Sequence, residues 1–239
     1  MEFVQHLLDY KFLSNALIIS IVVGIVCGTV GCLIVLRGLS LMGDAMSHAV
    51  LPGVALSFLF NIPMFIGALI TGMIASIFIG FITKNSKTKP DAAIGISFTA
   101  FLAMGIILIS LINSTTDLYH ILFGNLLAVT QSTFWSTIVV GVLVMILIIL
   151  FYRPLMVSTF DPVFSRMSGL NTTITHYFVM LLLSLVIVAS IQTVGIILVV
   201  ALLITPASAA FLIAKKLHTM MIISSLFSTI SAIVGLYFS

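Results

Sequence analysis

The chain has 239 residues, of which 62% are hydrophobic and only 6% are charged, and its formal net charge is +3 at pH 7. Soluble domains are about 45–50% apolar and about 25% charged, and so apolar a chain lacks the polar residues needed to cover its surface in water. These numbers predict a membrane protein, and they exclude a nucleic-acid-binding domain, a cytosolic enzyme and a disordered linker.

Long stretches without a charged residue predict about eight transmembrane helices, because a helix needs about 20 apolar residues to cross the hydrocarbon core. In chain order, these stretches are Phe12–Leu36, Ala45–Thr83, Ala92–Thr116, Leu118–Tyr152, Met167–Ala214 and Leu217–Ser239. Polar breaks at Asn61-Ile62-Pro63 and near Gln192-Thr193 divide the second and the fifth stretch into two spans each. Continuous apolar runs do not alternate as barrel strands would. The expected fold class is therefore all-α, a polytopic membrane helical bundle that forms a single domain over residues 1–239.

The basic residues predict which loops face the cytoplasm. Apart from Lys11, they lie in four places: Arg37; Lys84, Lys87 and Lys89; Arg153 and Arg166; Lys215 and Lys216. The positive-inside rule puts all four on the cytoplasmic side, so an even number of spans separates each pair. Between Lys89 and Arg153 this leaves two spans, Ala92–Ile112 and Thr133–Tyr152, and makes Asp117–Val129 an outer half-helix or re-entrant segment. The same parity puts Met1–Lys11 outside.

Small residues recur at the spacing that lets membrane helices pack closely. Gly24 and Gly28 form a GxxxG motif, and Gly72, Ser76 and Gly80 repeat the same spacing. Small side chains at such positions let two helix backbones approach each other. We expect these residues to mark helix contacts inside the bundle, and a contact between subunits is the alternative.

Asp44 and His48 are the ionisable residues that the bundle has least reason to contain. An ionisable group at membrane depth is costly and points to a function. The two residues are four positions apart, which puts them on one face of a helix with their Cβ atoms about 5–6 Å apart. A carboxylate oxygen and an imidazole nitrogen can together bind Mn²⁺, Fe²⁺ or Zn²⁺. Both residues are therefore candidate metal ligands.

Two ligands from one chain do not complete a four-ligand site. Water and other side chains complete it, or a two-fold dimer supplies a second Asp44 and His48. The alternative interpretation is structural: Asp44 balances the dipole at the cytoplasmic start of a helix, and His48 bonds to a backbone carbonyl. Pro52 and Gly53 follow one turn later, as breaks that membrane helices tolerate and that often line a cavity.

The loop between Arg153 and Gly169 contains the pattern of a short cytoplasmic helix. Asp161 followed by Pro162 is a typical helix start, and Gly169 is a typical stop. Such a helix presents three apolar side chains to the cytoplasm, those of Val163, Phe164 and Met167. We expect a docking surface for a soluble partner, and a helix that lies on the lipid surface is the alternative.

Four stretches, taken together, resemble a known family. Leu36–Gly53 reads LRGLSLMGDAMSHAVLPG and resembles the signature of permeases of the zinc/manganese/iron ABC importer family, the ABC-3 type. Three further stretches match in order: Leu122–Val129, Phe160-Asp161-Pro162 through Gly169, and Gly195–Ala207. The resemblance spans nearly the whole chain. It ends early, however, because such permeases usually continue past a further glycine-containing segment, so we expect a shortened chain or a missing final helix after Ser239.

The resemblance implies a complete transport assembly in the bacterial plasma membrane. Two copies of the permease pair with two ATPase subunits on the cytoplasmic side, and an extracellular metal-binding lipoprotein delivers the ion. Asp44 and His48 are then the metal ligands of the pathway. The coupling loop, residues 153–170, carries the residues that contact the ATPase: Asp161, Pro162, Phe164, Arg166 and Gly169. The implied cargo is Mn²⁺ or Zn²⁺, with Fe²⁺ as a further option, and no cofactor is bound permanently.

The source of energy distinguishes the ABC importer hypothesis from the main alternative, a proton-coupled transporter. The chain has no lysine directly after a glycine, and therefore no Walker A loop to bind ATP. It is expected to be a transport subunit and not itself an enzyme, so energy comes from a partner ATPase or from an ion gradient. The rival is a secondary proton-coupled metal transporter, which usually needs several intramembrane carboxylates, whereas Asp44 is the single deeply placed acid that we identify. A purely structural membrane subunit is a further alternative.

Overall fold

The computed structural model describes residues 11–85, 89–111 and 129–238, and these residues fold into helices joined by short connections. In chain order, the helices are α2 (Lys11–Leu36), α3 (Leu41–Ala49), α4 (Leu51–Phe60), α5 (Met64–Asn85), α6 (Pro90–Leu111), α8 (Gln131–Leu150), α9 (Tyr152–Phe160), α10 (Pro162–Met167), α11 (Thr172–Val194), α12 (Ile196–Ile213) and α13 (Leu217–Phe238). Eight spans in this part of the chain are long and apolar enough to cross a membrane, with α3 and α4 forming one of them together. The predicted fold class and number of spans are confirmed.

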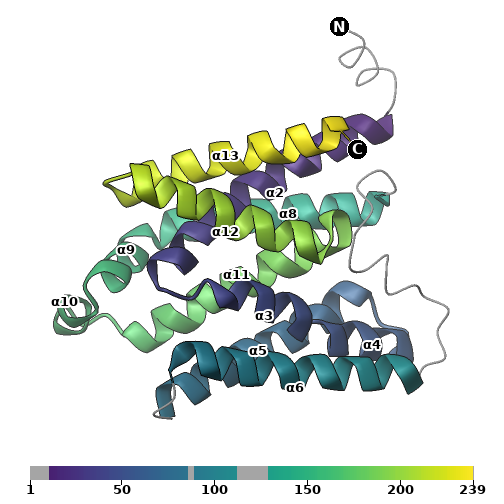
Figure 1. The fold of residues 1–239 in the computed structure, drawn as a ribbon, viewed down its shortest axis with the longest axis horizontal. Coiled ribbons are helices and arrows are strands. Elements are labelled where there is room, and N and C mark those ends of the chain that lie inside the picture. The colour runs from purple at the N-terminus through teal and green to yellow at the C-terminus, as the bar shows by residue number, and fades with distance from the viewer. Residues whose placement is uncertain (1–10, 86–88, 112–128, 239) are drawn as a thin grey trace, which may run out of the picture.

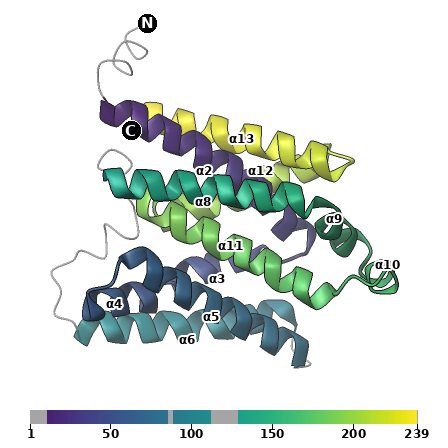
Figure 2. The same cartoon turned by 180° about the vertical axis from the view of Figure 1, so that it is seen from behind.

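The helices form two groups with α11 between them (Figures 1 and 2). One group contains α2, α8, α12 and α13, and the other contains α4, α5 and α6, with α3 beside α11. Because α11 contacts α2, α5 and α8, most of its side chains are buried. The core includes Ile19, Leu33, Met46, Leu182 and Leu183, each fully buried.

The connections that carry basic residues lie at one end of the bundle. Figure 1 shows the α2–α3 connection, the α5 and α6 ends, α9 and α10, and the α12–α13 turn all on the same side, opposite the two termini. This arrangement agrees with the parity that the positive-inside rule requires. The predicted outer segment Asp117–Val129 lies, apart from Val129, outside the described residues.

Two predicted breaks between spans are found, one of them displaced. Asn61 ends α4 in the left-handed region with φ of 52°, which asparagine tolerates better than most residues. The break expected near Gln192-Thr193 is instead at Gly195, where φ is 83°. Glycine adopts this conformation without the steric cost of a Cβ atom, and therefore the helix continues through the two polar residues and ends at Gly195.

The second span is divided at Val50, directly after the candidate metal ligands. Pro52 has no backbone N–H and cannot bond to the carbonyl of His48, which lies four positions earlier. Gly53, whose position suggested a cavity, is packed tightly against α5. It is buried, and a Cβ atom at this position would meet the carbonyl oxygen of Gly67 on α5. Pro52 and Gly53 therefore shape a tightly packed kink.

The small residues mark helix contacts inside the chain, as predicted. A Cβ atom on Gly24 would lie 2.8 Å from the Cα of Thr229 on α13, and one on Gly28 would lie 2.7 Å from the Cα of Ser225. On α5, a Cβ atom on Gly72 would meet the side chain of Ser184 on α11, and one on Gly80 would meet the ring of Tyr177. The backbones of α2 and α13 approach each other at these positions, whereas the glycines of α5 make room for side chains of α11.

Candidate metal site and docking helix

Asp44 and His48 lie on successive turns of α3 and face the same side. Asp44 is in the first turn and His48 is in the last. The His48 Nε2 atom lies 3.6 Å from Asp44 Oδ1. The Asp44 side chain is 53% exposed and that of His48 is 22% exposed, so the pair is accessible from outside the chain. The predicted juxtaposition of a carboxylate and an imidazole on one helix face is found.

The His48 ring is held by apolar packing. Its centroid lies 5.2 Å from that of Phe98 on α6, in an edge-to-face arrangement. The Nδ1 atom is buried and has no hydrogen-bond partner among the described residues. The structural alternative therefore holds only for Asp44, which does lie in the first turn. His48 makes no hydrogen bond to a backbone carbonyl within the described part of the chain.

The distance between the two side chains suits a shared metal ion. Ligand atoms about 2.1 Å from a tetrahedral ion are about 3.4 Å apart, close to the observed 3.6 Å between Nε2 and Oδ1. The described residues contain no group of three or more His, Cys, Asp or Glu side chains that could hold a metal ion. Within the described part of the chain, further ligands would have to come from another kind of side chain, and water or a second molecule is a source outside it.

The loop after α8 contains the short helix that the sequence predicts, here α10. The Asp161 carboxylate caps it by accepting a hydrogen bond from the Phe164 backbone N–H at 2.8 Å, and Pro162 occupies the first turn. Gly169 follows the helix with φ of 80°. Three apolar side chains are exposed, those of Val163 (69%), Phe164 (57%) and Met167 (83%).

The segment before this helix forms a second helix, for which the sequence pattern gives no prediction. Tyr152–Phe160 forms the separate helix α9. Pro154 lies in its first turn, where a backbone N–H has no helical partner and its absence costs little. Two helices thus follow one another in this loop, with Pro154 in the first turn of α9 and Pro162 as the first residue of α10.

Arg37 connects the end of α2 to α9, a role that sequence reasoning missed. Its guanidinium donates hydrogen bonds from Nη2 to Ser158 Oγ at 2.9 Å and from Nε to Thr159 Oγ1 at 3.1 Å. Burial lowers the pKa of Arg37 to about 10. The sequence shows only a cation after the first span, because its partner Ser158 lies 121 positions away.

The comparisons with known proteins decide the family. The ABC 3 transport family matches residues 9–239 of the chain. The chain belongs to the ABC 3 transport family. Its sequence is 56% identical, over 100% of this chain and 85% of the relative, to the manganese transport system membrane protein MntC of Listeria monocytogenes. It is 54% identical, over 99% of this chain and 84% of the relative, to the manganese import system permease protein ScaB of Streptococcus parasanguinis.

A solved structure resembles this ABC 3 chain closely. That structure is PsaBC from Streptococcus pneumoniae in complex with Fab, which is 50% identical, has a TM-score of 0.89, and aligns over 99% of this chain and 85% of that one. Family membership and the eight apolar spans found among the described residues identify this ABC 3 chain as a multi-pass protein of the bacterial plasma membrane.

Proposed function

We propose that this chain is the permease subunit of an ABC importer that carries a divalent transition-metal ion, with Mn²⁺ as its principal cargo. The observation that carries the proposal is the pair Asp44 and His48, 3.6 Å apart on one accessible face of α3, in a chain of the ABC 3 family. Relatives at 56% and 54% identity are named as manganese transport proteins, which favours Mn²⁺ over Zn²⁺ and Fe²⁺.

Asp44 and His48 hold the ion transiently in the pathway. One carboxylate and one imidazole form a small and mixed ligand set, which suits Mn²⁺ as well as Zn²⁺. A cargo site must also release its ion, so a partial set from each chain is an advantage. A second copy of the chain, related by a two-fold axis, supplies the same two ligands from the other side. The 53% exposure of Asp44 supports this arrangement, because its carboxylate is open to such a partner.

Energy enters from a separate ATPase subunit that seats on α10. The exposed side chains of Val163, Phe164 and Met167 support this role, since an apolar group of this kind on a short loop helix typically marks a protein contact. The coupling surface includes Asp161, Pro162, Phe164, Arg166 and Gly169. On the opposite side of the membrane, an extracellular metal-binding lipoprotein delivers the ion. No cofactor is bound permanently, because the metal is the transported substrate.

The test measures metal content in cells that lack this chain. Elemental analysis follows rescue by the wild-type chain or by the variant Asp44→Asn, with Mn, Zn and Fe supplied separately. We expect wild type to restore manganese and Asp44→Asn to fail while it still inserts in the membrane. The matched control is Asp91→Asn, which alters an exposed acid in the first turn of α6 and is expected to rescue fully. Normal manganese accumulation with Asp44→Asn would overturn the site.

A second measurement separates the ABC importer from the proton-coupled alternative. Uptake is followed after ATP depletion with the membrane potential maintained. The ABC importer stops, because the chain depends on ATP hydrolysis by its partner, whereas a proton-coupled carrier continues. Uptake that survives ATP depletion would therefore contradict the proposal even if Asp44 is essential.

A further inference from the structure

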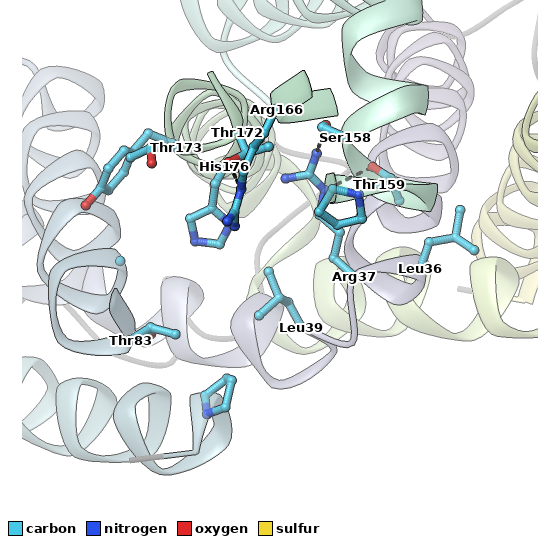
Figure 3. A pocket seen from close by; sticks show the side chains of 14 residues that line it. Leu36, Arg37, Leu39, Thr83, Ser158, Thr159, Arg166, Thr172, Thr173 and His176 are labelled. Atoms are coloured by element: carbon cyan, nitrogen blue, oxygen red, sulfur yellow. Dashed lines mark hydrogen bonds between the residues drawn. The ribbon is translucent and has the colours of Figure 1, made fainter. Parts of the chain in front are cut away.

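A cavity of about 500 Å³ opens at the end of the bundle that carries the basic connections. It lies where α2, α5, α6, α9, α10 and α11 meet, and Figure 3 shows its lining. Two guanidinium groups enter it, Arg37 from the end of α2 and Arg166 from α10. The His176 side chain of α11 lines the same space.

The other polar groups of the cavity are neutral hydrogen-bonding groups. Six hydroxyl side chains line it, those of Thr83, Ser158, Thr159, Thr172, Thr173 and Tyr177. No carboxylate is among the described residues that line the cavity. Two acids are adjacent in sequence to lining residues: Asp161 is occupied as the cap of α10, where it accepts the Phe164 N–H, and Asp91 is exposed in the first turn of α6 and is not a lining residue. The lining is therefore positively charged, and it would repel a metal cation.

Arg37 is the strongest indication that a negative ligand belongs here. It is partly buried, and this burial lowers its pKa to about 10, so it stays protonated at neutral pH. Its two hydrogen bonds go to neutral hydroxyls, on Ser158 and Thr159. In the described residues the only ion pair is that of Asp44 with His48. A cation that is partly removed from water and has no counter-charge is stabilised when an anion binds beside it.

Arg166 has capacity left for the same ligand. Its Nε atom donates to Thr172 Oγ1 at 3.3 Å, and no hydrogen bond of its terminal nitrogens is found with a described residue. Guanidinium groups present fixed pairs of N–H donors that match the oxygens of a phosphate. The hydroxyls of Thr172 and Thr173 on α11 can donate to the remaining oxygens, whereas those of Ser158 and Thr159 on α9 already donate to the Leu155 carbonyl.

We propose that this cavity binds a phosphate group between Arg37 and Arg166, at the cytoplasmic surface of the membrane. Two sources share this chemistry, the headgroup of an anionic phospholipid and free inorganic phosphate. Basic cavities between membrane helices on the cytoplasmic side are typical sites for anionic headgroups. The bound phosphate would join the end of α2, seven residues before Asp44, to the helix α10. The site does not depend on which metal the chain transports.

The test uses the full chain in nanodiscs of phosphatidylcholine alone or of phosphatidylcholine with phosphatidylglycerol. Native mass spectrometry counts the phosphatidylglycerol retained, and thermal unfolding measures stabilisation by the lipid or by added inorganic phosphate. The variants are Arg37→Gln and Arg166→Gln. Arg166 is exposed and donates one long hydrogen bond, so its variant folds even if Arg37→Gln does not. The matched control is Arg153→Gln, an exposed cation of the same region that does not line the cavity.

Each glutamine variant in the cavity is expected to weaken phosphate-group binding about tenfold or more, as the loss of a charge-assisted hydrogen bond implies. Arg153→Gln is expected to leave binding unchanged, and Arg37→Lys to retain part of it. A lipid site is identified if the wild type retains phosphatidylglycerol that millimolar phosphate does not displace. A soluble ligand is identified if inorganic phosphate stabilises the wild type in nanodiscs of phosphatidylcholine alone. If neither ligand binds the wild type better than the Arg37→Gln and Arg166→Gln variants, the proposal is wrong.

Discussion

Gly53 on α4 and Gly67 on α5 bring the two helix backbones into direct contact. A Cβ atom on Gly53 would meet the carbonyl oxygen of Gly67, and one on Gly67 would meet the carbonyl oxygen of Gly53. The contact is therefore reciprocal, and neither position has room for a methyl group. It fixes α4 against α5 immediately after the kink that follows His48, so packing and the candidate metal site are linked at this point.

Gly53→Ala is expected to destabilise the protein. The added methyl group meets backbone and the Thr71 hydroxyl, which cannot move aside as a flexible side chain would. Overpacking of this kind typically costs about 1–3 kcal/mol or more. Thermal unfolding in detergent measures the effect. The control is Gly95→Ala on α6, where a Cβ atom has no neighbour within 4 Å. Equal melting temperatures for the two variants would contradict the contact.

The spans could be predicted from sequence because bilayer thickness alone sets their length. Phe12–Leu36 as an uncharged stretch corresponds to α2, which begins one residue earlier, at Lys11. The spacing of Asp44 and His48 needed only the helical repeat, and the side chains do share a face. In both cases the information is local in sequence, so no knowledge of tertiary packing was required.

Contacts between distant segments could not be predicted in this way. The sequence around Gly53 suggested a helix break beside a cavity, but Gly53 is surrounded by atoms of α5, where Gly67 is its neighbour. In the sequence, Arg37 indicated only which side of the membrane its loop faces. Its hydrogen-bond partners Ser158 and Thr159 come close to it only in the folded chain. The same limit applies to the phosphate cavity, whose two arginines lie on α2 and α10. Separate elements must meet before such a site exists.

Asp161→Ala is expected to loosen α10 without unfolding the bundle. The carboxylate accepts the Phe164 N–H at 2.8 Å, and loss of such a cap typically costs about 1 kcal/mol. Hydrogen exchange at the Phe164 amide should become several-fold faster, as an opening equilibrium shifted by that amount implies. Asp161→Asn keeps a capping oxygen and should restore protection. If the asparagine variant exchanges as fast as the alanine variant, charge and not capping holds the helix.

Met167→Glu is expected to weaken association with the ATPase subunit. The side chain is 83% exposed, so its replacement leaves the fold intact, whereas a carboxylate buried in an apolar contact is unfavourable. We expect affinity to fall about tenfold or more, measured by co-purification and by titration of the ATPase into permease nanodiscs. Met167→Leu keeps the apolar contact and should bind as wild type. Unchanged binding of the glutamate variant would show that α10 lies on lipid or faces solvent.

His48→Asp is expected to shift metal preference from Zn²⁺ toward Mn²⁺. Imidazole nitrogen favours zinc, whereas a site with only carboxylate oxygens suits manganese. The Phe98 ring contacts the His48 ring at 5.2 Å between centroids. The shorter aspartate does not make this contact. Competition of zinc against radioactive manganese uptake measures the change, and we expect the inhibitory zinc concentration to rise about tenfold, a difference of about 1.4 kcal/mol.

Phe98→Leu is the control, because it disturbs the packing of the ring but leaves both ligands. If Phe98→Leu shifts zinc inhibition as much as His48→Asp does, packing around the ring sets the preference and His48 is not a ligand. If neither variant shifts it, selection occurs before the ion reaches α3.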